Sequence, residues 1–255
     1  ADLNDINMID PFHLEAYGET TVNYNRDVEI FPVLNTIFEK IYGESPYKSP
    51  TDMGVNMAGN CICDDEACRE ASKQEIIRRY FDALNALAKG STSEKEAQKI
   101  ELLMNMAGIT VTDRKVVIKA LERAKETDGP AAALELRDGR IITGKTTNLL
   151  GASAALLLNV LKVLAGIDHE THIISPESIE PIQKLKVDYL KSKNPRLHTD
   201  EVLIALSASA ATNPQARLAL SQLPELAGCQ AHTSVMLSDV DIKIFKKLEV
   251  ELTSE

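Results

Sequence analysis

The sequence predicts an α/β (α+β) protein in which an N-terminal helical subdomain precedes a three-layer α/β domain. Nine of the eleven Phe and Tyr residues precede Asp82, whereas the rest of the chain relies on Ala, Leu, Ile and Val, so we expect two parts with different cores. The first part shows helical patterns, and the second alternates short β-capable runs with helices. The turn formers at Asp128-Gly129-Pro130 place the boundary between a loop-rich, helical subdomain at 1–128 and a layered subdomain at 129–255.

Four helices are predicted in the first part from apolar residues at helical spacing and from their start and stop signals. Ser93 and Glu96 form a capping box, and Gly90 and Gly108 each follow the end of an apolar pattern. The expected helices are residues 27–41, 65–89, 93–108 and 112–125, with Thr112 as the cap of the last and a Gly- and Pro-rich loop at 43–59.

The second part begins with a hairpin signal, because two β-capable runs at 131–136 and 140–143 flank Asp138-Gly139, a dipeptide suited to positive φ. The apolar segment 149–165 predicts a buried helix that ends at Gly166. The remaining expected elements are a strand at 171–174, a helix that starts at Ser175-Pro176-Glu177, helices from Thr199 and Asn213, a strand at 233–237, a helix at 239–248 and a strand at 250–252.

Composition excludes several classes of protein. With 44% hydrophobic and 26% charged residues among 255, the chain is typical of globular proteins and unlike collagen-like or disordered ones. It has no apolar run long enough to span a membrane and no signal-peptide pattern at its start, so we expect a cytoplasmic protein without a membrane partner. The net charge of −10 argues against nucleic acid as a partner.

The order hairpin, helix, strand, proline-led helix, strand resembles the cytidine-deaminase-like fold. Zinc deaminases place a His or Cys and then a Glu at the first helix, and Pro-Cys-x-x-Cys at the second. Here residues 151–154 offer no ligand, and Glu177 and Glu180 stand at the cysteine positions, so we expect this layout without zinc ligands. Another candidate metal site combines Cys61, Cys63 and Cys68 with the acids Asp64, Asp65 and Glu66. Its spacing matches no strong zinc pattern, and the cysteines are either ligands of a thiophilic metal or plain thiols; our prediction is no metal and no cofactor within this chain.

Candidate ligand-binding residues lie in two polar loops of the first part. Asn23, Tyr24, Asn25, Arg26 and Asp27 place amides, a phenol, a guanidinium and a carboxylate just before a helix, where they can orient a polar ligand. In the alternative reading, Asp27 caps the helix and the others are surface residues. The candidates of the second loop, which spans 45–54 and is rich in Pro and Ser, are Tyr47, Lys48, Thr51 and Asp52.

Two histidine-containing segments occur in the second part. Arg196 and His198 precede a helix N-terminus that is able to hold an anion, although plain capping by Thr199 or Asp200 is an alternative reading. His169 and His172 lie at the entry to the predicted strand at 171–174, where their side chains diverge, so we do not expect them to act together.

The stretches 2–27, 45–57, 129–136 and 193–200 together resemble an uncharacterised bacterial family, domain of unknown function eighteen forty-six, over essentially the whole chain. The resemblance implies that the chain is the C-terminal half of a protein about twice as long. It also implies that the other half is an α/β unit with a Pro-Gly-Ser-Gly-Lys loop, similar to loops that cradle phosphate. The family carries no assigned reaction.

Two function hypotheses follow. In the first, the chain is part of a cytosolic enzyme that acts on a phosphorylated or nucleotide ligand, bound mainly by the other half of the protein; a nucleotide would then be a cofactor of the whole protein and the other half the partner of this chain. In the second, the chain is a non-catalytic interaction module that associates with itself. The polar loops favour the enzyme, and the smooth Ala- and Leu-rich helices favour assembly.

Overall fold

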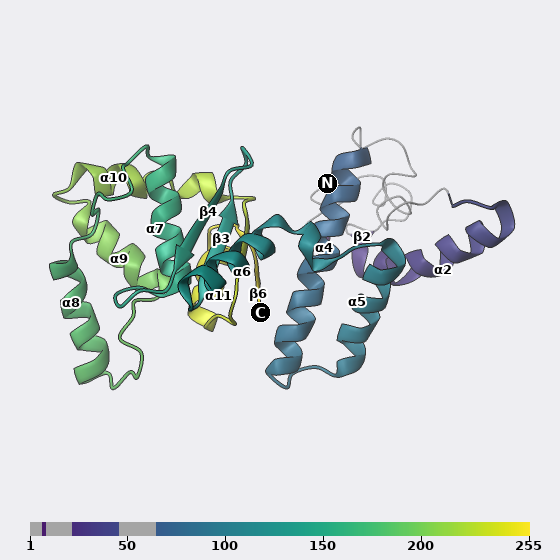
Figure 1. Ribbon diagram of the computed structural model, residues 1–255, viewed down its shortest axis with the longest axis horizontal. Helices are drawn as coiled ribbons and strands as arrows, with labels where there is room; N and C mark the ends of the chain where they lie inside the picture. The colour runs from purple at the N-terminus through teal and green to yellow at the C-terminus, as the bar shows by residue number, and fades with distance from the viewer. Residues whose placement is uncertain (1–6, 9–21, 46–64) are drawn as a thin grey trace. The chain divides into compact units, whose positions relative to one another are not determined.

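A computed structural model describes residues 7–8, 22–45 and 65–255, and the chain forms two compact units, Ala1–Arg114 and Lys115–Glu255. Each unit is described by itself. The described elements of the first unit are strands β1 (Asn7–Met8) and β2 (Val22–Asn23), helices α2 (Tyr24–Tyr42), α4 (Asp65–Ala88) and α5 (Glu94–Ala107), and the 3-10 turn η2 (Val111–Asp113). Helices α4 and α5 lie side by side, and α5 also contacts α2 (Figure 1).

The helices predicted at 65–89 and 93–108 are confirmed as α4 and α5. At the starts of two predicted helices, the caps differ from the predicted ones. Ser93 makes no side-chain cap, and a capping box forms instead where the backbone amide of Thr110 donates to the Asp113 carboxylate at 2.7 Å. Because this bond closes η2 and Arg114 is extended, the next helix begins at Lys115 and Thr112 is not its cap.

The second unit contains a four-stranded mixed sheet and helices, which confirms the α/β class. Its elements are α6 (Lys115–Thr127), β3 (Ala131–Glu135), β4 (Ile141–Lys145), α7 (Ala152–Leu164), α8 (Pro176–Lys184), η3 (Leu185–Tyr189), α9 (Thr199–Ser209), α10 (Pro214–Leu220), η4 (Leu223–Leu226), β5 (Gln230–Thr233), α11 (Asp239–Lys247) and β6 (Glu251–Ser254). The strand order is β4-β3-β5-β6. Strand β3 is antiparallel to both neighbours, and β5 and β6 are parallel.

Helices cover both faces of this sheet. Alternate side chains of β3 point in opposite directions, so Ala133 packs against Val116 and Ala120 of α6, whereas Ala132 and Leu134 belong to the large core under α7 (Figure 1). The sequence placed α6 in the first subdomain. Because the apolar face of α6 packs on the sheet, the turn at 128–130 connects two elements of one unit, and the boundary lies at Arg114 and Lys115 instead.

Most elements of the second unit are where the sequence predicts them. The hairpin is confirmed, with Gly139 at φ 82° in its turn, and the predicted helices are present as α7, α8, α9, α10 and α11. The strand predicted at 171–174 is wrong. Ile173 and Ile174 are buried in the core without pairing to a strand, since β-branched apolar residues report burial and not a hydrogen-bonded ladder. The strand predicted at 233–237 lies further upstream, as β5.

One glycine sets the distance between α7 and the sheet. A Cβ atom on Gly144, in β4, would lie 2.5 Å from the Cα atom of Leu156 and closer still to its backbone nitrogen. Residues 152–158 of α7 are all buried and begin with four small side chains, so the helix backbone rests directly on the strand.

We expect Gly144→Ala to lower the free energy of unfolding by about 3 kcal/mol or more, because the new methyl group would meet backbone atoms that cannot rotate away. Urea denaturation measures the change. Gly129→Ala is a matched control, since a Cβ there meets only a carbonyl oxygen at 3.8 Å. Equal stability of the two variants would mean that α7 shifts away from the strand without cost.

Candidate anion-binding site

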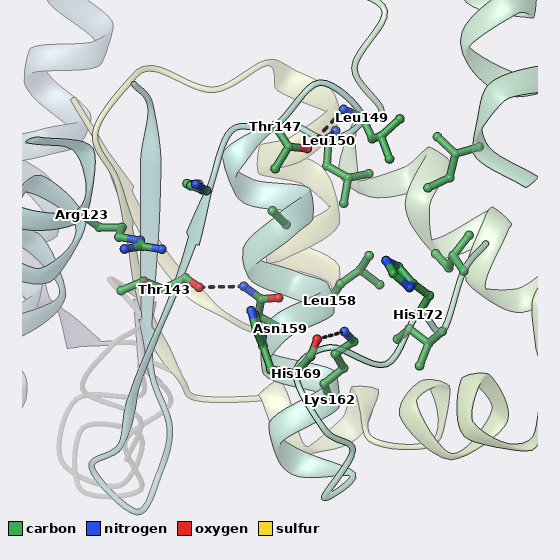
Figure 2. A pocket seen from close by; sticks show the side chains of 15 residues that line it. Arg123, Thr143, Thr147, Leu149, Leu150, Leu158, Asn159, Lys162, His169 and His172 are labelled. Carbon is green, nitrogen blue, oxygen red and sulfur yellow. Dashed lines mark hydrogen bonds between the residues drawn. The ribbon is translucent and has the colours of Figure 1, made fainter. Parts of the chain in front are cut away.

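A pocket of about 260 Å³ opens in the second unit beside the edge strand β4. Its walls come from α6, β4, the loop before α7, α7 itself, the segment between α7 and α8, and α8 (Figure 2). The inner wall is aliphatic and includes Leu158, Ile173 and Ile179. The pocket therefore combines an apolar interior with a polar rim, the usual composition of a small-molecule site.

Five basic side chains line the pocket, and no Asp or Glu does so. They are Arg123 of α6, Lys145 of β4, Lys162 of α7, and His169 and His172 of the following segment. The chain as a whole carries a net charge of −10 with His counted as neutral, so the three cations Arg123, Lys145 and Lys162 without an acid in the lining run against its overall composition. Such a pocket attracts anions.

Two hydrogen bonds hold the polar rim together (Figure 2). Asn159 of α7 donates from Nδ2 to the Thr143 carbonyl at 2.9 Å and so connects the helix to β4. Lys162 donates from Nζ to the His169 carbonyl at 2.6 Å and fixes the start of the irregular segment. Burial lowers the pKa of Lys162, because the lost hydration of its ammonium group outweighs the nearby carboxylates of Glu170 and Asp168. An anion in the pocket would offset this desolvation.

Arg196, predicted as an anion donor, supports the loop before α7 instead. Its Nε donates to the Thr147 carbonyl at 2.7 Å. Thr147 lines the pocket, and its hydroxyl accepts hydrogen bonds from the backbone amides of Leu149 and Leu150 at 3.2 and 3.0 Å. The structure thus places Arg196 behind the rim of the pocket, where it positions the loop through a backbone carbonyl.

His198 contacts a buried carboxylate and not an open site. Its Nδ1 lies 2.9 Å from Asp241, a residue of α11 that is 3% exposed. The same carboxylate accepts hydrogen bonds from the backbone amide and hydroxyl of Thr199 at 2.9 and 2.8 Å, and from the Ser238 hydroxyl at 2.8 Å. The start of α9 is further closed by Glu201, which accepts from the His198 amide at 2.8 Å. Asp241 therefore occupies the position that the sequence predicted for an external anion.

The predicted residues of the first part fall on two stretches, of which the structure describes one. Asn23 ends β2, and Tyr24, Asn25, Arg26 and Asp27 form the first turn of α2, so the loop expected before the helix is absent. The physical reason is that β2 pairs with β1 up to Asn23, and the chain turns directly from strand into helix. The other four predicted residues, Tyr47, Lys48, Thr51 and Asp52, lie outside the described residues.

The predicted strand at 171–174 would send the side chains of His169 and His172 to opposite faces, and this prediction is wrong. Because residues 171–174 form no strand, the alternation that would send the two imidazoles to opposite faces does not apply, and both line the pocket. Arg123, Lys145 and Lys162 carry no local motif that sequence inspection would detect. They meet only because α6, β4 and α7 pack together.

Among the described residues, no three His, Cys, Asp or Glu side chains gather as metal ligands would, and no helix has the length and hydropathy needed to cross a membrane. Cys61 and Cys63 lie outside the described residues. At the start of α8, hydrogen bonds from its own backbone amide and from Ser175 lower the pKa of Glu177, which fits the role of a carboxylate at a helix N-terminus.

Comparison with known proteins confirms the family resemblance. Residues 1–108 match "Domain of unknown function DUF1846, N-terminal", and residues 112–255 match "Domain of unknown function DUF1846, C-terminal". The chain therefore belongs to the DUF1846 family. UPF0371 protein cu0538 of Corynebacterium urealyticum is 60% identical over 255 residues, and UPF0371 protein str1377 of Streptococcus thermophilus is 56% identical over 253 residues.

These matches correct one expectation. The chain spans about half the length of its curated relatives, 51% of each of the two named above. It is nevertheless not the C-terminal domain alone, because both the N-terminal and the C-terminal domains of the family match it. The limits of these matches fall close to the division between the two compact units, at Arg114 and Lys115.

Asp241→Asn should lower the free energy of unfolding at pH 7 by about 2–4 kcal/mol, because it removes a buried charge that several donors share. Burial alone would raise the pKa of Asp241, but hydrogen bonds from Thr199, His198 and Ser238 lower it below the ordinary 3.8. The ionised Asp241 carboxylate therefore contributes its full share to the free energy of unfolding above pH 3.8, and this share is lost as the pH falls through the folded-state pKa.

Urea denaturation at several pH values measures this effect. The stability of the wild type should decline in the acid range more steeply than that of Asp241→Asn. Asp239→Asn, an exposed residue in the same first turn of α11, is the matched control and should change stability by less than about 1 kcal/mol. Parallel acid profiles for wild type and Asp241→Asn would contradict the assigned role of Asp241.

Proposed function

We propose that this chain is part of an enzyme that acts on a small phosphorylated ligand, and that the pocket of the second unit binds the phosphate. One observation carries the proposal: five basic side chains and no acidic one line this pocket in an otherwise acidic chain. Guanidinium, ammonium and imidazolium groups are the side chains that bind phosphate most strongly. The volume of about 260 Å³ suits a metabolite of a few carbon atoms and excludes a polymer chain.

The surroundings of two lysines on the rim, Lys145 and Lys162, also support phosphate binding. The Lys145 side chain makes no hydrogen bond or ion pair within the described residues, and Lys162 is partly desolvated. Cations that serve only solubility are normally hydrated or paired on the surface, as Lys119 is with Glu122 at 2.7 Å. Lys145 is exposed and differs from Lys119 only in having no such partner, whereas the desolvated Lys162 beside an apolar wall gains more from an incoming anion than a hydrated cation does.

The cytidine-deaminase-like layout remains a proposal for the second unit. The β3–β4 hairpin, helix α7, the proline-led α8 and the parallel pair of β5 and β6 support it, whereas the missing strand at 171–174 counts against it. In either case, Ser153 and Glu177 stand where such enzymes carry zinc ligands. We therefore propose chemistry that does not depend on a deaminase zinc centre.

The second candidate is an interaction module that associates with itself. Leu185, Tyr189 and Leu190, in and after η3, are 50, 72 and 69% exposed, and exposed apolar side chains so close together favour a contact surface. Self-association in sedimentation experiments that Leu190→Ser abolishes would support this candidate. The two candidates are compatible, since η3 does not line the pocket.

We expect Lys162→Gln to weaken the binding of inorganic phosphate about tenfold or more, the effect of losing one charge-assisted hydrogen bond. A thermal shift titration with phosphate, glucose 6-phosphate and AMP measures this, because a ligand that binds the native state raises the melting temperature. The wild type should show a saturable increase, and Lys162→Gln a smaller one at every concentration.

Lys119→Gln is the matched control, since it removes the same charge from an exposed position that does not line the pocket. It should respond to phosphate as the wild type does. An equal loss in both variants would show that only the overall charge matters, and no response of the wild type to any of the three compounds would refute the proposed function.

A further inference from the structure

We infer that the pocket binds a ligand with two separate anionic groups, one held by Arg123 and Lys145 and the other by Lys162, His169 and His172. This inference rests on the proposed function and deepens it, because it specifies the class of ligand. Such a compound is a small bisphosphate or a phosphorylated carboxylic acid.

The two basic clusters lie on different supports. Arg123 and Lys145 come from α6 and the edge strand β4, whereas Lys162 belongs to α7, and His169 and His172 to the segment that follows it. Figure 2 shows Arg123 and His172 on opposite sides of Asn159. The basic groups on both sides of Asn159 are the observation from which we infer a second anionic group.

The first cluster, Arg123 and Lys145, contains hydrogen-bond donors that have no partner among the described residues. The Nη1 atom of Arg123 contacts Glu126 at 2.9 Å, but its Nε is buried and has no hydrogen-bond partner within the described residues. A buried donor without an acceptor is costly unless a ligand or water satisfies it. Lys145 is exposed and likewise has no partner among the described residues, so its ammonium group is available to an anion, whereas the buried Arg123 Nε needs a shift of the side chain to reach one.

The second cluster, Lys162, His169 and His172, also contains nitrogen atoms that make no hydrogen bond within the described residues. The imidazole rings of His169 and His172 make no hydrogen bond within the described residues, although Glu177 lies near enough to His172 to interact with it electrostatically. Lys162 uses one of its three N–H donors on the His169 carbonyl and retains two. A phosphate presents several acceptor oxygens, which these donors can share.

An uncharged section separates the clusters. The Asn159 amide nitrogen is committed to the Thr143 carbonyl, which leaves its Oδ1 able to accept from a hydroxyl group. Leu158 lies beside it in the sequence and contributes apolar surface to the pocket. The ligand should therefore carry a short linker, aliphatic or hydroxylated, between its anionic groups.

A series of bisphosphates tests this inference. Isothermal titration calorimetry on the chain would compare propane-1,3-diol, butane-1,4-diol, pentane-1,5-diol and hexane-1,6-diol bisphosphates with the matching alkyl monophosphates. At least one bisphosphate should bind about tenfold tighter than its monophosphate, the factor expected for one further charge-assisted contact. A clear optimum of linker length should occur, because Lys145 and Lys162 stand on a strand and a helix that pack against each other.

Variants then assign the two clusters. Lys145→Gln and Lys162→Gln should each reduce bisphosphate affinity to that of the monophosphate, whereas Lys119→Gln should leave both affinities unchanged. Monophosphate affinity should fall by no more than about twofold in Lys145→Gln. In Lys162→Gln it should fall about tenfold, as for inorganic phosphate, because a single phosphate group binds mainly to the cluster that contains Lys162. Lys145→Arg should restore the preference for bisphosphates, which separates loss of charge from loss of structure.

The titrations distinguish a failure of the two-cluster inference from a failure of the proposed function. If monophosphates bind and Lys162→Gln abolishes that binding, but no bisphosphate binds tighter, then a single anion site exists; the two-cluster inference falls and the proposed function stands. If none of these compounds binds to the wild type, both fall.

Discussion

The backbone of α7 lies directly against strand β4 because Gly144 has no side chain, and both the core and the pocket depend on this contact. The neighbours of Gly144 in the strand, Thr143 and Lys145, line the pocket. One helical turn after Leu156, the residue that Gly144 meets, Asn159 reaches the Thr143 carbonyl. Any side chain at position 144 would move the helix away from the strand and with it Asn159 and Lys162.

The distribution of charge follows a second constraint. Acidic side chains of the second unit satisfy structural needs: Asp241 and Glu201 accept the free donors at the start of α9, and Glu201 also neutralises the buried Lys186 at 2.7 Å. The pocket contains no such acid. Arg123 is paired with Glu126 outside the lining, but Lys145 has no acidic partner among the described residues and Lys162 donates only to a backbone carbonyl, which favours the binding of an external anion.

The segment between α7 and α8 connects the fold to the proposed chemistry. A regular strand at 171–174 would have separated His169 and His172 by the alternation of a pleated backbone. The irregular path instead buries Ile173 and Ile174 in the core and leaves both imidazoles at the pocket. The Lys162 bond to the His169 carbonyl fixes the beginning of this path.

The sequence by itself determined the family, the α/β class, most helices of both units and the β3–β4 hairpin. These depend on local signals such as the Asp138-Gly139 turn and the Asn213 cap, which act over a few residues. Only the tertiary structure decided that α6 belongs with the sheet, that Asp241 fills the start of α9, and that Arg123, Lys145 and Lys162 share one pocket. Arg123, Lys145 and Lys162 belong to three different elements of the chain. Spacing along the sequence does not show which helix faces which strand, whereas the packing of α6 and α7 around β4 brings the three side chains to one pocket.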